Sequence, residues 1–126
     1  MMVRRIVEVD GRVGQPNIPA CVVLGNLILP SVISGRDPAA SEQSDDPEIQ
    51  IAQAFVNMKA VVEAAGGTLD GIGKVTVYLK DFSHRRYVNE CWQAMFPDAD
   101  NRPARHVLKA ELQPGDWVQL DVIASL

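Results

Sequence analysis

The chain has 126 residues, of which 47% are hydrophobic, and this length and composition predict a single folded domain over residues 1–126. Its net charge is −4, and no basic run stands out that could neutralise phosphates, which argues against a general nucleic-acid-binding or membrane-surface protein. The longest apolar run is too short and too interrupted to span a membrane. Cys21 and Cys91 are far apart and not spaced as metal ligands. With no signal peptide, we expect a cytoplasmic protein with both thiols reduced.

The first third of the chain predicts three strands and then a long loop. The strands are expected at Arg4–Val9, Ala20–Leu24 and Leu27–Leu29. Asp10-Gly11 follows the first strand as a turn, and Gly25-Asn26 joins the second and third strands through a dipeptide typical of tight turns. The segment from Pro30 to Asp45 is rich in Ser, Gly, Pro and Asp, which predicts a loop. Long structureless loops are often functional.

Two amphipathic helices with a strand between them are predicted next. The first helix has Asp46 as its N-cap and Pro47 in its first turn, and it ends at Gly66-Gly67. The second helix is expected to be capped by Ser83 and stopped by Pro97. Their buried stripes are Ile51, Phe55, Met58 and Val62 on the first, and Val88, Cys91, Trp92, Met95 and Phe96 on the second. The strand between them is Lys74–Lys80, with Val75, Val77 and Leu79 facing inward.

The last two strands alternate between two chemically different faces, and a turn at Gln113–Asp116 predicts that they form a hairpin. The apolar face holds Leu108, Ala110, Leu112, Val118, Leu120 and Val122. The opposite face holds Arg105, Val107, Lys109, Glu111, Trp117, Gln119, Asp121 and Ile123. An arginine would then share one sheet face with polar groups and a tryptophan, which suits either an anion-binding site or a subunit interface.

The elements follow the order β-β-β-α-β-α-β-β, which predicts an α+β fold with both helices packed on one face of a β-sheet. The other face is expected to carry Tyr78, Val107, Trp117 and Ile123 among polar residues. Because no helix covers this half-apolar face, the pattern predicts association of subunits.

The C-terminal segment also carries a family resemblance. Pro103-Ala104-Arg105, followed by a hairpin ending in Asp121-Val122-Ile123-Ala124, resembles the signature of the RidA family, also called YjgF or reactive intermediate deaminases. Four upstream blocks match the family's pattern in order: Leu24–Ile28, Asn57–Gly66, Lys74–Asp81 and Val88–Glu90. The likeness covers nearly the whole chain from about Val22 onward.

The resemblance implies a chorismate mutase-like (YjgF) fold with a mixed β-sheet, assembled as a homotrimer whose sheets face an inner barrel. It implies three sites in clefts between subunits. There a small enamine or imine carboxylic acid is hydrolysed to a ketone or keto acid and ammonia. The implied partners are a small carboxylate or imino-acid substrate and further copies of this chain. No nucleic acid, membrane, cofactor or metal is implied.

Arg105 and Gln119 are the catalytic candidates. Arg105 matches the family arginine that grips the substrate carboxylate, for which a guanidinium fork offers two parallel donors. Gln119 stands where deaminase members carry a glutamate that is thought to position or activate the attacking water. An amide can hold a water, but it cannot accept its proton. Either another residue such as Asp121 or Glu111 is the base, or the water is polarised without one, or the usual substrate is no longer hydrolysed.

Five positions shape the expected cleft. Val107 replaces a cysteine that is common in the family, at a place where the backbone makes the ligand contact. Ile18 lies near the position of the usual tyrosine, Ser31 matches a family serine, and Val32 replaces the glycine after it. These changes predict a reshaped cleft that favours a larger and more apolar imino acid. Trp117 is either an interface residue or a platform on which the substrate stacks.

The sequence also allows other roles. The chain could bind a carboxylate metabolite without turnover, which the glutamine at position 119 favours. An endoribonuclease or translation inhibitor is the weaker alternative, because this acidic chain shows no basic-aromatic RNA surface. Arg105 could instead form a structural ion pair with Asp or Glu across the sheet. His106 is expected to face the core.

Overall fold

The computed structural model describes residues 3–9 and 17–126, so the turn expected at Asp10-Gly11 lies outside the described residues. The strands are β1 (Arg5–Val7), β2 (Cys21–Leu24), β3 (Leu27–Pro30), β4 (Ile33–Ser34), β5 (Ile72–Leu79), β6 (Ala104–Lys109) and β7 (Val118–Ser125). The helices are α1 (Pro47–Ala64) and α2 (Arg85–Met95), with short 3₁₀ turns η1 (Leu69–Gly71) and η2 (Phe82–His84). No helix in the described ranges is long and apolar enough to cross a membrane.

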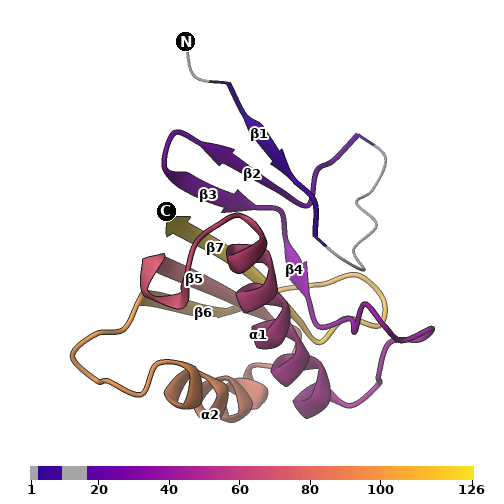
Figure 1. Ribbon diagram of the computed structural model, residues 1–126. Helices are drawn as coiled ribbons and strands as arrows, with labels where there is room; N and C mark the ends of the chain where they lie inside the picture. Colours follow the sequence, from indigo (N-terminus) through magenta and orange to yellow (C-terminus); the bar gives the residue numbers. More distant parts are fainter. Residues whose placement is uncertain (1–2, 10–16) are drawn as a thin grey trace.

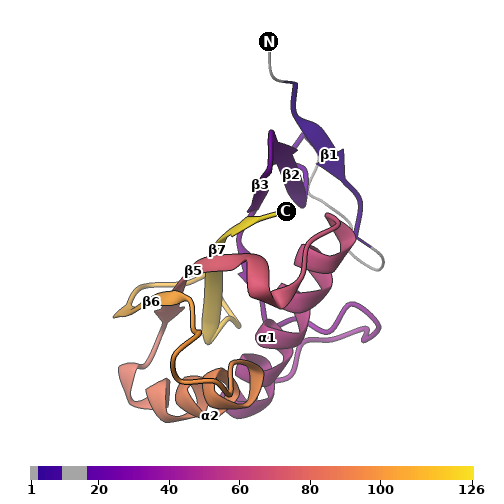
Figure 2. The same ribbon diagram turned by 60° about the vertical axis from the view of Figure 1, so that its left-hand side comes forward.

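All strands belong to one mixed sheet in the order β1-β2-β3-β7-β5-β6, with β4 pairing with β7. Every pair of neighbours is antiparallel except β5 and β6, which run parallel. Both helices pack on one side of the sheet, where α1 crosses the strands and α2 lies beside it (Figure 1, Figure 2). The α+β class with two helices on one face is therefore confirmed.

The hairpin predicted for the last two strands is wrong, because β5 lies between them. Val77 of β5 is fully buried and pairs with Val107 on one side and Leu120 on the other. Alternation within a strand indicates which residues share a face, but it does not identify the neighbouring strand. Two strands close in sequence can therefore each pair with a third that carries the most buried residues.

The face assigned to Arg105 and Val107 is also wrong. The parallel register places Arg105 opposite Val75 and Val107 opposite Val77, and paired residues project to the same side of a sheet. Since Val75 and Val77 are completely buried beneath the helices, both β6 residues lie on the helix-covered side. His106 is exposed on the other side instead of facing the core.

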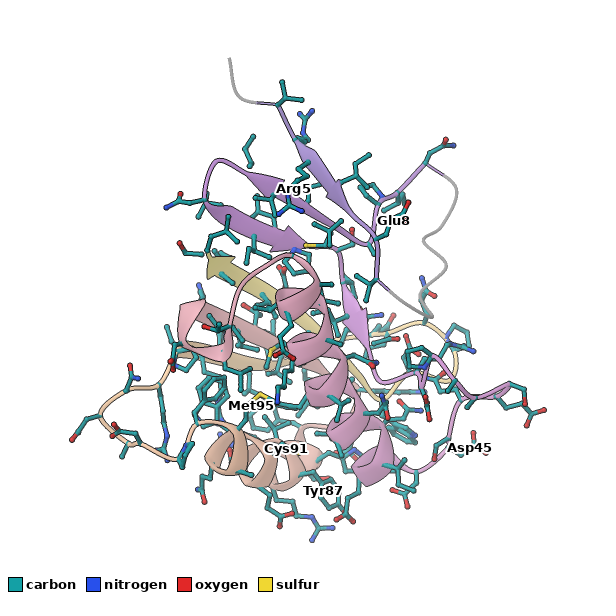
Figure 3. The ribbon with its side chains drawn as sticks, viewed as in Figure 1. Arg5, Glu8, Asp45, Tyr87, Cys91 and Met95 are labelled. Carbon is teal, nitrogen blue, oxygen red and sulfur yellow. The ribbon has the colours of Figure 1, made fainter. Side chains whose placement is uncertain are left out.

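The helix signals were correct for α1 and partly correct for α2. Asp46 caps α1 by accepting hydrogen bonds from the backbone N–H groups of Glu48 and Ile49, and the predicted stripe is buried. The expected cap at Ser83 is wrong, because Asp81 accepts from the Ser83 N–H and begins the η2 turn instead. Cys91 and Met95, which belong to the stripe predicted for α2, project from this helix toward the interior (Figure 3).

The segment expected to be a loop from Pro30 to Asp45 contains the short strand β4, which helix α1 holds in place. The buried Asn57 side chain donates from Nδ2 to the backbone oxygens of Ser34, at 2.9 Å, and Arg36, at 2.8 Å. Gly35 between them passes so close to α1 that a Cβ would clash with the Gln50 carbonyl oxygen. The chain around β4 is thus fixed against the helix.

Candidate functional site

A large cavity lies on the side of the sheet away from the helices, where β4, β7 and the two long loops meet. Its volume is about 920 Å³. Four of the positions predicted to form the site line it together, namely Ile18, Ser31, Val32 and Gln119. Arg36, Asp116 and Asp121 also contribute to its wall. The four predicted positions, which come from separate parts of the sequence, therefore lie around one cavity.

The apolar and hydroxyl parts of the wall come from the segment that precedes β2 in the chain and from the segment that follows β3. Ser31 donates from Oγ to the Pro19 carbonyl oxygen at 2.8 Å, so its hydroxyl ties the two segments together. Ile18 and Val32 stay 52% and 55% exposed although they are aliphatic. The cavity consequently offers apolar surface at its mouth to a bound molecule or to a second chain.

Gln119 lies on β7, paired with Ser34 of β4 on one side and Tyr78 of β5 on the other. Its Nε2 donates to Asp116 Oδ2 at 3.3 Å. The second carboxylate oxygen of Asp116, Oδ1, accepts from Gln43 Nε2 at 3.0 Å. A carboxylate therefore lies directly beside the glutamine, at a position that the sequence motif did not single out.

Gln50, a fully buried polar residue of α1, fixes the backbone around Asp116. Its Nε2 donates to the carbonyl oxygens of Ser44 and Gly115, and its Oε1 accepts from the Trp117 N–H. One side chain therefore anchors the loop before α1 and both neighbours of Asp116. Gly115 has a φ of 88°, which favours glycine at this turn.

We expect Gln50→Leu to destabilise the fold by about 3 kcal/mol or more, because buried donors and acceptors that lose their partner each cost about 1–3 kcal/mol. The check is the midpoint of urea unfolding, with Gln93→Leu as control because Gln93 is exposed on α2. Equal midpoints for the two variants would show that Gln50 does not hold these loops.

Arg105 lies elsewhere, on β6 against helix α2. Its Nη2 donates to Asn89 Oδ1 at 2.8 Å, and its guanidinium carbon is 5.2 Å from the centre of the Trp92 ring. Burial, with a smaller contribution from the nearby positive charge of Arg85, lowers the pKa of Arg105 from its usual value. No carboxylate forms an ion pair with Arg105 within the described ranges. A poorly solvated guanidinium with no anionic partner is chemically suited to bind an anion.

Val107 and Trp117 do not line the large cavity. The Val107 side chain packs against the core on the helix side of the sheet. The indole of Trp117 donates from Nε1 to the Asp45 carbonyl oxygen at 2.9 Å and meets the His84 ring edge-on, with the ring centres 5.2 Å apart. Asp45 lies in the loop just before α1 (Figure 3). Trp117 thus connects segments that lead into the two helices.

Arg105 and Gln119 cannot meet within one chain. Their strands are separated by β5, so two strand spacings of about 4.8 Å lie between the backbones. The two side chains also project to opposite faces, because Arg105 contacts α2 while Gln119 lines the cavity on the uncovered face. A site that uses both residues therefore needs two copies of the chain.

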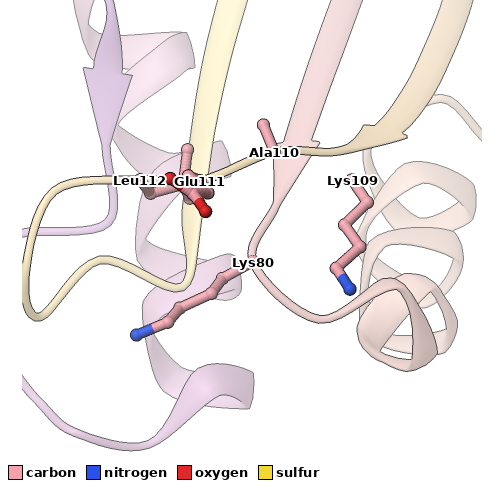
Figure 4. A pocket seen from close by; sticks show the side chains of 5 residues that line it. All are labelled: Lys80, Lys109, Ala110, Glu111 and Leu112. Atoms are coloured by element: carbon pink, nitrogen blue, oxygen red, sulfur yellow. The ribbon is translucent and has the colours of Figure 1, made fainter.

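A second, smaller cavity of about 500 Å³ opens at the ends of β5 and β6. Lys80 and Lys109 extend along it, and Glu111 belongs to its wall (Figure 4). Glu111 therefore lines this second cavity and not the one that Gln119 lines. Asp121, in contrast, lines the same cavity as Gln119. Across residues 3–9 and 17–126, no group of three or more His, Cys, Asp or Glu side chains gathers as a metal site.

Comparison with known proteins places the chain in a family. The family model described as endoribonuclease L-PSP matches residues 20–126. The chain belongs to this family. It is the RidA/YjgF family, since one relative is the 2-iminobutanoate/2-iminopropanoate deaminase of Escherichia coli strain K12, 34% identical over 105 residues that cover 82% of each chain.

Other members extend the comparison. A RutC family protein of Haemophilus influenzae is 35% identical over 106 residues, again 82% of both chains. The crystal structure of RidA from an Antarctic Psychrobacter superposes with a TM-score of 0.87 at 29% identity, covering 97% of this chain and 99% of that one. The RidA/YjgF fold expected from the sequence is therefore confirmed over essentially the whole length.

Three residues that contact or support Arg105 and Gln119 were not singled out as site residues in the sequence. Asn89, which lies within the matching block Val88–Glu90, accepts a hydrogen bond from Arg105 and orients it. Gln50 carried a usable signal, because it stands seven residues before Asn57 and so on the same helix face, next to the apolar stripe. Asp116 carried none, since its contact with Gln119 depends on the turn at Gly115.

Proposed function

We propose that the protein hydrolyses imine or enamine carboxylic acids to keto acids and ammonia, in clefts between the subunits of a homotrimer. The observation that supports this most strongly is the Arg105 guanidinium, half-buried, oriented by Asn89 and lacking an anionic partner in the described chain. The comparisons agree in chemistry, because relatives at 32% and 34% identity are named 2-iminobutanoate/2-iminopropanoate deaminases.

Each cleft combines two halves from different chains. Arg105 of one subunit binds the substrate carboxylate through paired N–H donors, and the backbone near Val107 on the same edge strand contacts the substrate amine. The second subunit supplies the cavity with Ser31, Ile18 and Gln119. Imines already hydrolyse slowly in water, so placing a water against the C=N bond supplies much of the required acceleration.

The proposed homotrimer can be tested by the mass of the protein in solution. We expect light scattering at micromolar concentration to give a mass near three times the 13.8 kDa of the chain. The reason is the uncovered sheet face, on which Ile123 is 48% exposed, together with the separation of Arg105 from Gln119. A stable monomer would rule out the cleft between subunits, whatever else the chain binds.

The activity is tested with imines that an amino-acid oxidase generates in situ from a panel of small and bulky amino acids. We expect acceleration over the uncatalysed rate, with a preference for bulkier imines, because Ile18 and Val32 expose apolar surface in a cavity of about 920 Å³. Low activity on 2-aminoacrylate is expected as well. Preference for the smallest imine would show that these wall residues do not set specificity.

A binding protein without turnover is the second candidate, and one observation favours it: position 119 holds an amide. It would bind small carboxylates such as 2-oxobutyrate but leave every imine in the panel at its uncatalysed rate. A ribonuclease is disfavoured by the charges in the cavity, where Arg36 is accompanied by Asp37, Asp116 and Asp121. Three carboxylates there would repel a phosphate backbone.

A further inference from the structure

The pair formed by Gln119 and Asp116 is built so that one member holds a water and the other takes its proton. An amide has one donor end and one acceptor end. Since Gln119 Nε2 donates to the Asp116 carboxylate at 3.3 Å, its Oε1 is turned away from that carboxylate and is left to accept. Both residues line the same cavity, so a water bound by this oxygen has the carboxylate as its neighbour.

We propose that Asp116 is the general base of the reaction and receives the proton of the water that Gln119 holds. This inference rests on the deaminase function proposed above. It explains how a chain without a carboxylate at position 119 can still activate water. The base is displaced by three residues along the chain but remains in hydrogen-bond contact with the residue that holds the water.

Asp116 is unusually well fixed for a residue in a connecting loop. Gln50 bonds the carbonyl oxygen of Gly115 on one side and the N–H of Trp117 on the other, at 2.8 Å and 2.9 Å. The Asp116 N–H donates to the Gln113 carbonyl oxygen at 3.0 Å, closing the turn. Gln43 holds the carboxylate itself from the far side. A base held in this way needs little reorganisation when the substrate arrives.

The proton transfers balance without any co-reactant. The water oxygen forms a bond to the imine carbon while the C=N electron pair moves to nitrogen, and one water proton passes to Asp116. The protonated carboxyl group then gives this proton to the amine of the carbinolamine. Asp116 then takes the remaining hydroxyl proton and passes it to the nitrogen as the C–N bond breaks, so that ammonia leaves, the keto group forms and Asp116 is a carboxylate again.

The other charged groups at the cavity are Arg36 and Asp37, in the segment after β4, and Asp121 on β7. Asp37 is exposed, and its Oδ1 accepts from the Ala39 N–H in a local turn. Asp121 lines the same cavity but is exposed and has no hydrogen bond to Gln119. Asp116 is the carboxylate that contacts Gln119. Asp121 is a carboxylate of the same cavity without that contact, so its substitution is the matched control.

The test compares Asp116→Asn with Asp121→Asn in the intact protein, measuring the pH profile of imine hydrolysis and the binding of 2-oxobutyrate. We expect Asp116→Asn to lower kcat about a hundredfold or more, as loss of a general base typically does. It should also abolish the fall in rate toward acid pH, while binding of 2-oxobutyrate stays unchanged. Asp121→Asn should keep the acid limb and lose much less rate.

A second variant separates chemistry from folding. Adding Gln119→Glu to Asp116→Asn returns a carboxylate to the water, so the double variant should regain rate and the acid limb. A wild type that accelerates no imine would overturn both the proposed function and this inference. An active wild type whose rate and pH profile survive Asp116→Asn would overturn the inference alone. A larger loss in Asp121→Asn would assign the base to Asp121 and overturn it too.

Discussion

Arg105→Ala is expected to weaken the binding of small carboxylates such as pyruvate and 2-oxobutyrate by about 2–5 kcal/mol, the usual cost of truncating one partner of a buried, hydrogen-bonded charge pair. That range corresponds to roughly a thirtyfold to a few thousandfold rise in Kd. The reason is that Arg105 is poorly solvated and lacks an anionic partner of its own among the described residues. Titration calorimetry measures the effect directly.

The control for this variant is Arg4→Ala, which removes the same charge from an exposed position next to β1, at the opposite edge of the sheet. Its Kd should equal that of the wild type. Asn89→Ala should lie in between, because the guanidinium would keep its charge but lose the hydrogen bond at 2.8 Å that orients it. Equal affinities in the wild type and Arg105→Ala would assign Arg105 to structure alone.

Signals that act within a few residues were sufficient to predict much of the fold. Asp46 and Pro47 marked the start of α1 correctly, because an N-cap bonds backbone groups only two and three residues ahead. The turn at Gly25, with φ of 61°, likewise joins β2 and β3 as its sequence indicated. Such features depend only on interactions between residues that are close in sequence, and these can be recognised in a single sequence.

Pairing over long sequence distances could not be predicted in the same way. The pairing of β6 and β7 with β5, and the register of each pair, place Arg105 on the α2 side and Gln119 on the cavity side. Nothing in the local alternation of either strand encodes that choice. The contact between Asp116 and Gln119 could not be predicted for a related reason. It depends on a turn that the buried Gln50 of α1 holds in place.

The separation of Arg105 from Gln119 leads to the sharpest test of the assembly, in which two inactive variants restore each other. Arg105→Ala removes the carboxylate anchor, and Val32→Trp fills the other half of the cleft at an exposed position. If every site takes its arginine from one subunit and its cavity from the next, a mixed trimer contains one site in which both halves are intact. Random assembly from equal amounts should make about a quarter of all sites functional.

Imine hydrolysis after co-expression of the two variants, or after their unfolding and joint refolding, measures this recovery. Each variant alone should be inactive, and light scattering should give each the mass of the wild type, so that the recovered rate comes from mixed assemblies. The control is the same mixture made from separately folded trimers, which should stay inactive until subunits exchange. A site formed within one chain would give no recovery at any ratio, because each chain would carry its own defect. Recovery near a quarter of the wild-type rate would require that Arg105 and the Gln119 cavity act across a subunit boundary.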